Sequence, residues 1–124
     1  MPCLHAVRVC ALAPILLSLS TVCLAQGSRG SITGRILDQQ TAVIPGAAVT
    51  VKNLQTGLTS KVVTNQTGYY ETNFLDPGTY SVSAEVAGFK TMVRSGIVLE
   101  TGDRLSIDLP LEVGQSNQSV EVTA

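Results

Sequence analysis

The sequence predicts an all-β protein, an antiparallel β-sandwich of about seven strands. Three observations support this fold class. Past residue 30, apolar and polar residues alternate with a period of two in one short run after another, as in half-buried strands. Glycine, proline, asparagine and aspartate separate these runs at spacings near ten residues, which is typical of a sandwich. No window places apolar residues at helical spacing over three turns, so we expect no long helix there.

The first 25 residues have the composition of a secretory signal peptide, which would precede the sandwich. A start that carries Arg8 is followed by an apolar run, residues 9–17, and then by small residues up to Ala25. The apolar run is shorter than the ~20 residues that span a bilayer as a helix. We expect cleavage after Ala25, with residues 26–30 as a short linker. The alternatives are a retained anchor and a lipoprotein modified at Cys23.

Removal of the first 25 residues would change the composition of the chain. All three cysteines and the only histidine would leave with the signal peptide. Of the eight Lys and Arg residues, seven would remain against nine Asp and Glu, a net charge near −2. No disulfide is then available, and without a basic stripe we expect no nucleic-acid partner. No second long apolar segment follows, so we do not expect the mature chain to span a membrane by itself as a helix.

The first half of the predicted sandwich contains four alternating runs. They cover residues 31–38, 47–54, 58–64 and 69–74. In the fourth run, Tyr70, Thr72 and Phe74 share one face, which we expect to be buried. Tyr69 has the opposite parity and is expected to point outward.

The second half contains four further runs. They cover residues 79–87, 89–99, 104–113 and 119–123. In the first of them, Tyr80 shares a buried face with Val82, whereas Glu85 has the opposite parity and is expected to face out. The second, which is the longest, is expected to bend near Gly96. Pro110 should lie at a sheet edge or a bulge, because proline cannot donate to a β-ladder.

Residues 67–89 are predicted to form a hairpin whose aromatic side chains pack inward. Its central turn contains a proline that presets φ and a glycine that tolerates unusual backbone conformations. A second glycine would pass the chain to the next strand. The positions that we expect to be structural, in the core or in turns, are Tyr70, Phe74, Pro77, Gly78, Tyr80, Gly88 and Phe89.

The order of short motifs along this sandwich resembles that of a known family. The motifs are Gly34-Arg-Ile-Leu-Asp38, Ile44-Pro-Gly-Ala-Ala-Val-Thr-Val51, Thr67-Gly-Tyr-Tyr70, Leu75-Asp-Pro-Gly-Thr-Tyr80 and Ala87-Gly-Phe89. The chain resembles a carboxypeptidase-regulatory-like, transthyretin-like domain, as in the N-terminal extension of Oar-like TonB-dependent outer-membrane receptors. The resemblance implies a sandwich over residues 31–113. One departure is the loop at residues 39–42, where the family has a glycine, so we expect a different turn there.

The end of the sequence is similar to those receptors as well. In them, the segment that corresponds to residues 114–124 is a linker and short strand that lead into a plug domain and then a barrel. The plug and the barrel are absent from this sequence, so we expect either a piece of such a receptor or a free-standing secreted module. The resemblance thus implies export, to the periplasm, to the outer membrane as part of a receptor, or out of the cell.

The residues of the mature chain do not favour an enzyme. A catalytic zinc takes about three protein ligands, usually His with Glu or Cys, and the mature chain has neither His nor Cys. In carboxypeptidases the regulatory-like sandwich accompanies a separate catalytic domain, which this sequence lacks. Serines and threonines are plentiful, but no histidine can serve as their base. We expect no catalytic residue, metal or cofactor; Asp76 and Asp103, the candidates for calcium, are each isolated and should stabilise their own turns.

Two residues remain as candidates for contact with a partner, Tyr69 and Glu85, because parity points both outward. In self-crosslinking adhesin sandwiches, a lysine of the first strand forms an isopeptide bond that a glutamate on the inward face assists. We do not expect this crosslink here, because Glu85 lies on the face opposite Tyr80 and the first predicted strand has Arg35 in place of the lysine. The sequence favours a non-catalytic accessory or docking module of the cell envelope, whose partner is an unknown protein or glycan. The alternative is a carbohydrate- or peptide-binding module that uses Tyr69. The oligomeric state is not predicted.

Overall fold

The computed structural model of the protein describes residues 29–115 and 117–123. The predicted signal peptide and most of the linker after it lie outside the described residues. Within them, all of the regular secondary structure is β. The strands are β1 (Gly30–Leu37), β2 (Ala48–Asn53), β3 (Thr59–Val63), β4 (Tyr69–Leu75), β5 (Gly78–Glu85), β6 (Thr91–Leu99), β7 (Arg104–Ser106), β8 (Leu109–Pro110) and β9 (Ser119–Thr123).

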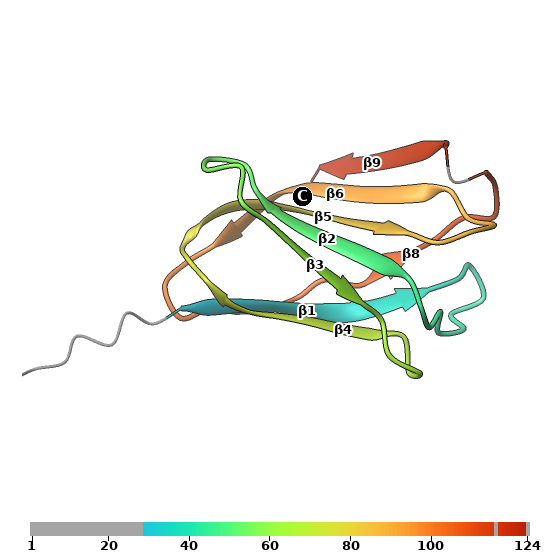
Figure 1. The fold of residues 1–124 in the computed structure, drawn as a ribbon, viewed down its shortest axis with the longest axis horizontal. Coiled ribbons are helices and arrows are strands. Elements are labelled where there is room, and N and C mark those ends of the chain that lie inside the picture. Colours follow the sequence, from blue (N-terminus) through green and yellow to red (C-terminus); the bar gives the residue numbers. More distant parts are fainter. Residues whose placement is uncertain (1–28, 116, 124) are drawn as a thin grey trace, which may run out of the picture.

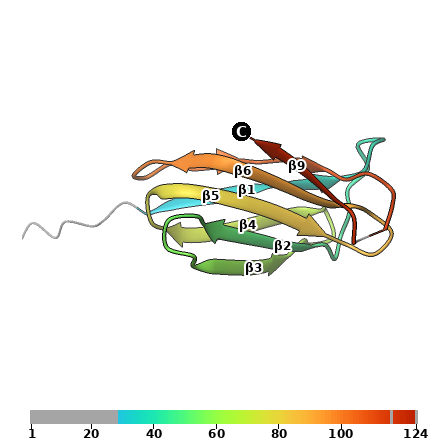
Figure 2. The same cartoon turned by 90° about the horizontal axis from the view of Figure 1, so that it is seen from above.

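The strands form two sheets that pack face to face, as Figure 1 and Figure 2 show from two directions. The larger sheet has five strands in the order β3-β2-β5-β6-β9. The smaller sheet has β1 at its centre, with β4 on one side and β7 followed by β8 on the other. Apolar side chains from both inner faces fill the space between the sheets. The predicted β-sandwich is confirmed.

Most ladders among the described strands are antiparallel, as predicted. These are β1–β4, β2–β3, β2–β5 and β5–β6. The ladders β1–β7, β1–β8 and β6–β9 are parallel, so the antiparallel prediction does not extend to the last three strands. The reason is that alternation of apolar residues indicates which face of a strand is buried, but not the direction of the neighbouring strand.

The strand predicted at residues 104–113 is interrupted between β7 and β8, and side-chain groups bridge the gap. The Arg35 N–H of β1 donates to Asp108 Oδ1 at 2.9 Å. The Tyr70 hydroxyl of β4 donates to the Ile107 carbonyl oxygen at 2.6 Å. These bonds take the place of ladder bonds at the break, so the backbone groups there keep their partners.

The close approach at this break requires a glycine on β1. A Cβ atom at Gly34 would lie 1.9 Å from the Ile107 carbonyl oxygen. Tyr70 is only 1% exposed, and burial, reinforced by the negative charge of Asp108, raises the pKa of its hydroxyl well above the ordinary value. The hydroxyl therefore stays neutral and able to donate into alkaline solution. We call Gly34, Tyr70, Ile107 and Asp108 the β1–β7 clasp.

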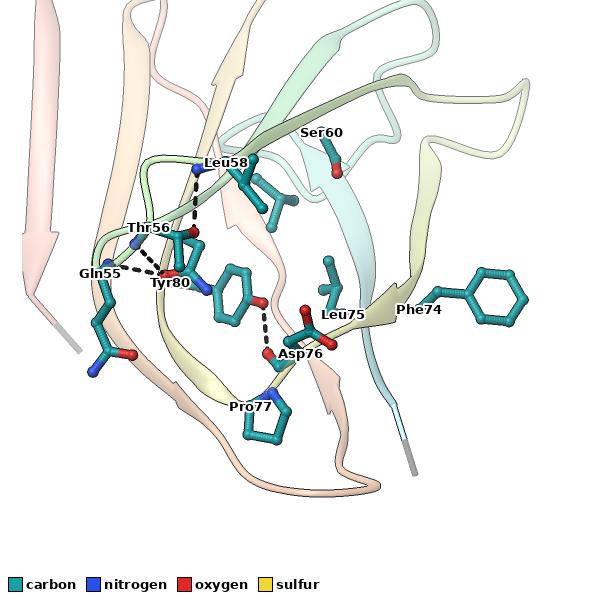
Figure 3. A pocket seen from close by; sticks show the side chains of 11 residues that line it. Gln55, Thr56, Leu58, Ser60, Phe74, Leu75, Asp76, Pro77 and Tyr80 are labelled. Atoms are coloured by element: carbon teal, nitrogen blue, oxygen red, sulfur yellow. Dashed lines mark hydrogen bonds between the residues drawn. The ribbon is translucent and has the colours of Figure 1, made fainter. Parts of the chain in front are cut away.

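Phe74 does not lie in the core, and that prediction is wrong. β4 carries a bulge in which Asn73 and Phe74 both lie opposite Ser31 of β1. The extra residue reverses the alternation, so Leu75 takes the buried position instead. Phe74 adopts a positive φ of 59° and is 79% exposed. Its ring points away from Leu75 in Figure 3.

Two local predictions about irregular strands are confirmed. β6 bends at Ser95 and Gly96, which together lie opposite the single residue Ser81 of β5. Gly96 has a φ of 76°, a conformation that glycine adopts without a steric penalty. Pro110 lies in the two-residue strand β8, at the edge of the smaller sheet.

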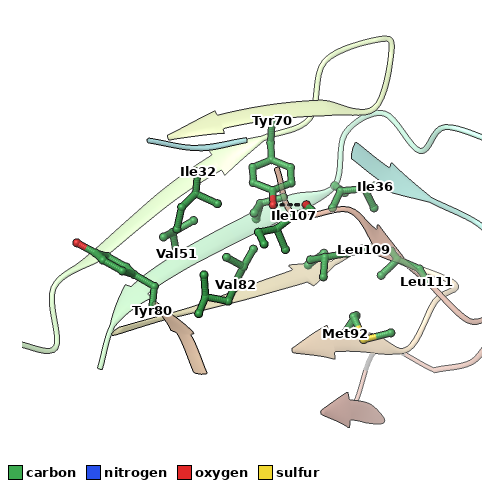
Figure 4. Packing of buried hydrophobic residues seen from close by; sticks show 14 of the residues in the cluster. Ile32, Ile36, Val51, Tyr70, Tyr80, Val82, Met92, Ile107, Leu109 and Leu111 are labelled. Carbon is green, nitrogen blue, oxygen red and sulfur yellow. Dashed lines mark hydrogen bonds between the residues drawn. The ribbon is translucent and has the colours of Figure 1, made fainter. Parts of the chain in front are cut away.

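One cluster of buried residues forms the core between the sheets (Figure 4). Tyr70 and Tyr80 are 1% and 3% exposed, as their parity predicts. The Tyr80 hydroxyl donates to the Asp76 carbonyl oxygen at 2.6 Å, which ties β5 to the turn before it. Phe89 is half-buried and packs against the cluster, so it lies at the margin of the core rather than within it. The other fully buried large side chains are Ile32, Ile36, Leu99, Leu109, Leu111, Val49, Val51 and Val82.

The predicted turn residues lie between strands, with one exception. Pro77 is exposed in the turn before β5, and Gly78 is already the first residue of that strand. Gly88 has a φ of 88° in the turn before β6. The loop at residues 39–42 closes without a glycine, because Thr41 takes a positive φ of 65° and Asp38 Oδ1 accepts two backbone N–H groups there.

Candidate binding surface

The outer face of the smaller sheet carries a trough of about 440 Å³. Side chains of β1, β4 and β7 whose parity is opposite to that of the core form most of its lining. The lining residues are Arg29, Ser31, Thr33, Tyr69, Glu71, Asn73, Phe74 and Arg104. We call this group the outer trough. It faces solvent over the central strand of its sheet, so it is held by ladders on both sides of β1.

Strand register determines which side chains meet in the outer trough. Thr33 pairs with Glu71 on β4 and with Ser106 on β7, so a polar row crosses the middle of the sheet. At the neighbouring position, Tyr69 pairs with Arg35. At this end of the trough, the half-buried residue Tyr69 therefore lies beside the exposed residue Arg35.

The other end of the outer trough is built around the bulge in β4. Ser31 pairs with Arg104 of β7 on one side and lies opposite Asn73 and Phe74 on the other. Arg29 lines the same end. This end therefore brings together the Phe74 ring, the Asn73 amide and the guanidinium groups of Arg29 and Arg104. The two arginines are more than seventy positions apart in the sequence.

The outer trough carries more positive charge than the chain as a whole, which has eight Lys and Arg against nine Asp and Glu. Arg29 and Arg104 line it, Arg35 lies beside it, and Glu71 is the one carboxylate among its lining residues. Arg29 lies 3.7 Å from Asp76, in an ion pair whose side chains are 60% and 72% exposed. An exposed pair of this kind contributes little to stability, so breaking it to engage a ligand would cost little free energy.

The position of Phe74 is strained. A bulky residue with a positive φ is an outlier, and such a conformation costs on the order of 1–3 kcal/mol. The bulge nevertheless places the ring on the solvent side, where it lines the outer trough and also a second pocket. Strain persists where the surrounding structure holds it and is concentrated at functional sites. The strain at Phe74 therefore favours a role in contact with a ligand.

The second pocket has a volume of about 190 Å³ and opens between β3 and β4 (Figure 3). Its apolar lining includes Leu58, which is 71% exposed, together with Phe74 and Leu75. Its polar groups are engaged locally: Asn53 Oδ1 accepts two N–H groups of the following turn, and the Tyr80 hydroxyl donates to the chain before β5. Gln55, Ser60 and Asp76 also line this edge pocket, so it combines apolar contact with polar groups.

The carboxylates in the described part of the chain do not gather into a metal site. Among residues 29–115 and 117–123, no three His, Cys, Asp or Glu side chains are placed to hold an ion. Asp103 Oδ2 accepts the Glu100 N–H within its own turn, and Asp76 pairs with Arg29. Over the same residues, no helix has the length and apolar character that crossing a bilayer requires.

The two predicted contact residues are not brought together. Tyr69 is half-buried and belongs to the outer trough. Glu85 is exposed at the end of β5, in the other sheet, where it pairs with Ala48. A site that uses both side chains at once is therefore not supported.

The sequence analysis missed most of the outer trough. Glu71 and Asn73 share the parity of Tyr69 on one strand, so the same alternation could have identified them. Arg104 enters only because β7 lies beside β1, and no sequence signal predicts that pairing. Phe74 enters through a bulge that has no glycine to mark it.

Comparison with known proteins agrees with this architecture. The chain matches the family model of the carboxypeptidase regulatory-like domain over residues 31–112. No curated protein matches the chain. The Bacillus anthracis TIE protein is 29% identical, with a TM-score of 0.59, over 69% of this chain and 17% of that one. A protein from Bacteroides uniformis, named as a candidate carbohydrate-binding protein, is 25% identical, with a TM-score of 0.56, over 68% of this chain and 42% of that one.

An enzyme is also among the similar structures. Catechol 1,2-dioxygenase from Acinetobacter is 11% identical, with a TM-score of 0.59, over 80% of this chain and 59% of that one. At this identity the likeness shows the fold alone. The chain spans less than two thirds of the length of each of these three proteins. The family match covers β2 to β8 and nearly all of β1, which leaves only β9 of the described strands outside it, and the chain belongs to the carboxypeptidase regulatory-like domain family.

Proposed function

We propose that this chain is a non-catalytic accessory module of a cell-envelope protein and holds a partner against its outer trough. The observation that carries the proposal is the trough itself. Two aromatic rings and three arginines gather on or beside a solvent-facing sheet surface that the core does not need. Aromatic residues and arginine are enriched where proteins bind their partners. The packed sandwich beneath makes this a surface that presents its groups rather than one that moves.

The setting that we propose is the N-terminal extension of a TonB-dependent outer-membrane receptor. Its support is the order of motifs between Gly34 and Phe89, which resembles that of Oar-like receptors, together with the signal-peptide composition of the first 25 residues. Such a chain is exported and works in the periplasm, at the outer membrane or outside the cell. The test is the DNA directly after the Ala124 codon. An in-frame plug and barrel supports the receptor setting, whereas a stop codon contradicts it and favours a free secreted module.

A second candidate function, binding of a carbohydrate or peptide, is favoured by Tyr69 and Phe74. Exposed aromatic rings beside amide and hydroxyl groups suit the recognition of either ligand. The similarity to the candidate carbohydrate-binding protein of Bacteroides uniformis gives further support. This candidate differs from the first in the nature of the partner, not in the surface used.

The proposed function is tested by co-sedimentation of the processed chain with isolated cell-envelope fractions. We expect the wild-type chain to be retained and the double variant Tyr69→Ala/Arg104→Ala to lose at least about tenfold in apparent affinity, or roughly 1.4 kcal/mol. Lys52→Ala is the matched control, because it removes one exposed cation from the outer face of the other sheet. Equal retention of all three chains, or retention of none, would contradict docking through the outer trough.

A further inference from the structure

We propose that the outer trough binds an acidic oligosaccharide, a chain of pyranose rings that carry carboxylates. This inference rests on the proposed function for the location of the surface and goes beyond it in naming the ligand class. Four features of the trough lead to it: the spacing of the aromatic rings, the excess of arginine, the polar row between them and the absence of a free strand edge over β1.

The aromatic rings of the trough are placed to bracket an extended ligand. Tyr69 and Phe74 lie five positions apart on β4, at opposite ends of the trough. Five strand residues span roughly 15 Å, less the shortening that the bulge introduces. That length accommodates several sugar rings in a row. The flat apolar face of a pyranose can pack on each aromatic ring, which buries apolar area at little cost in side-chain entropy.

The charge of the trough selects an anionic ligand. Arg29 and Arg104 line it from the bulge end, and Arg35 stands beside Tyr69 at the other end. A planar guanidinium fork matches the geometry of a carboxylate and can bind it through two hydrogen bonds. Two arginines line the trough against the one carboxylate of Glu71. Asp76, which is not in the lining, pairs with Arg29 at an exposed position. A carboxylated sugar chain would complement this balance, with the Glu71 oxygens left to accept from ring hydroxyls.

The polar row at the middle of the trough suits ring hydroxyls. Ser31 and Asn73 supply a hydroxyl and an amide that can each donate and accept, and the Thr33 hydroxyl, which donates to the Leu105 carbonyl oxygen at 3.4 Å, can still accept. The backbones of Ser31 and Thr33 are fixed by the ladders of β1, so these two side chains start from a defined position before a ligand arrives. Such preorganisation lowers the entropic cost of binding.

A sugar chain fits this face better than an extended acidic peptide. Peptides that bind β-proteins commonly add a strand to an exposed edge, where main-chain hydrogen bonds provide the affinity. β1 forms ladders with β4 on one side and with β7 and β8 on the other, so its backbone is already committed. The trough over β1 offers side chains alone. Recognition there must come from rings, hydroxyls and charges, which are the groups that acidic sugars complement.

The test is isothermal titration calorimetry of the processed chain with three probes. The first is a hexamer of galacturonic acid, the second is the same hexamer as its methyl ester, and the third is a hexamer of glutamic acid. We expect sub-millimolar binding of the free acid, weakening as salt is raised. The methyl ester keeps the rings but lacks the charges, and we expect it to bind at least about tenfold more weakly.

Variants separate the groups that the proposal invokes. Arg104→Ala and Tyr69→Ala should each weaken binding of the free acid at least about tenfold, and Arg104→Lys should restore it only in part, because lysine lacks the planar fork. Lys52→Ala, on the other sheet, should leave binding unchanged. Thermal unfolding of each variant checks that it is folded. Phe74→Ala provides a second test of stacking at the bulge end, where the ring is exposed and its loss leaves the core intact.

The outcomes distinguish this inference from the function on which it rests. Equal binding of acid and ester would overturn the role of charge, and binding of the peptide alone would overturn the ligand class. Binding of none of the probes would overturn the inference, while co-sedimentation with cell envelopes decides separately whether the trough docks a partner. If the chain neither binds a probe nor co-sediments with cell envelopes, the trough is refuted as a functional surface.

Discussion

Replacement of Tyr70 by phenylalanine tests whether the β1–β7 clasp holds the sandwich together. The substitution removes one oxygen atom and keeps the ring, so the cavity that it leaves is small. The Ile107 carbonyl oxygen, which now accepts from the Tyr70 hydroxyl at 2.6 Å, would lose that partner in a site where the ring is only 1% exposed. A buried polar group without its partner costs about 1–3 kcal/mol. That is a substantial share of the 5–15 kcal/mol by which domains of this size are typically stable.

The stability of the wild-type chain should also depend on pH in a way that identifies Tyr70. Its folded pKa is raised above the ordinary value, by burial first and by Asp108 second. The contribution of this hydroxyl is therefore complete below the unfolded pKa near 10 and is lost as pH rises further, because the unfolded chain releases a proton that the folded chain retains. The slope from this one group reaches about 1 kcal/mol per pH unit.

The assay is urea unfolding of the purified chain at pH 7 and at several values from pH 9 to 11.5. At pH 7, Tyr70→Phe should lower the midpoint by about 1 M, given m-values of 1–3 kcal/mol/M for small proteins. Above pH 10 its stability should fall less steeply than that of the wild type. Tyr69→Phe is the matched control, which removes the same atom from the outer face and should change stability by less than about 0.5 kcal/mol. If Tyr70→Phe costs no more than this control and its alkaline slope equals that of the wild type, the reasoning about the clasp is refuted.

Three further substitutions probe the fold. Gly34→Ala should destabilise by about 3 kcal/mol or more, because the new Cβ would overlap the Ile107 carbonyl oxygen; a near-neutral result by urea unfolding would mean that the two strands approach less closely. Tyr80→Ala should cost about 3–5 kcal/mol, since it empties a core position and removes the bond to Asp76, and a loss under about 1 kcal/mol would place the ring outside the core. Phe74→Gly should be neutral or stabilise by up to about 1 kcal/mol, because glycine accepts the positive φ without strain and the ring is exposed; a loss above about 1.5 kcal/mol would show that the ring supports the fold.

Local alternation predicted much of this fold because it reflects burial directly. Tyr70, Tyr80 and the apolar residues around them alternate with polar ones, and each lies where that pattern places it. The same rule predicted an outward Tyr69, which lies on the outer face although it is half-buried there. Burial is a property of each residue and its neighbours along the strand, so a single sequence can reveal it.

The features that escaped prediction depend on how distant strands meet. The break between β7 and β8 has no sequence signal, because Ile107 and Leu109 continue the alternation through it. The bulge at Phe74 breaks the alternation without glycine, which usually marks a positive φ. Parallel pairing of β7 with β1 places Arg104 in the outer trough. The paired residues are far apart in the sequence, so no local pattern predicts that they meet. Arg104 and Phe74 of the candidate site belong to this second group, whereas Glu71 and Asn73 share the outward parity of Tyr69.

Gly34 and Tyr70 of the clasp lie on the buried face of the β1–β4 ladder, opposite the trough, and this links stability to binding. The Gly34 position lets the chain after β7 approach β1, and the Tyr70 hydroxyl holds it there at the Ile107 carbonyl. The ladder that precedes this contact pairs Ser31 with Arg104, which sets the guanidinium beside the bulge. Loss of the clasp would free β7 to shift, and a shift of one residue would turn Arg104 toward the core face. Substitutions in the clasp should therefore weaken binding at the trough even though none of the clasp residues lines it, whereas substitutions such as Arg104→Ala should weaken binding and leave stability nearly unchanged.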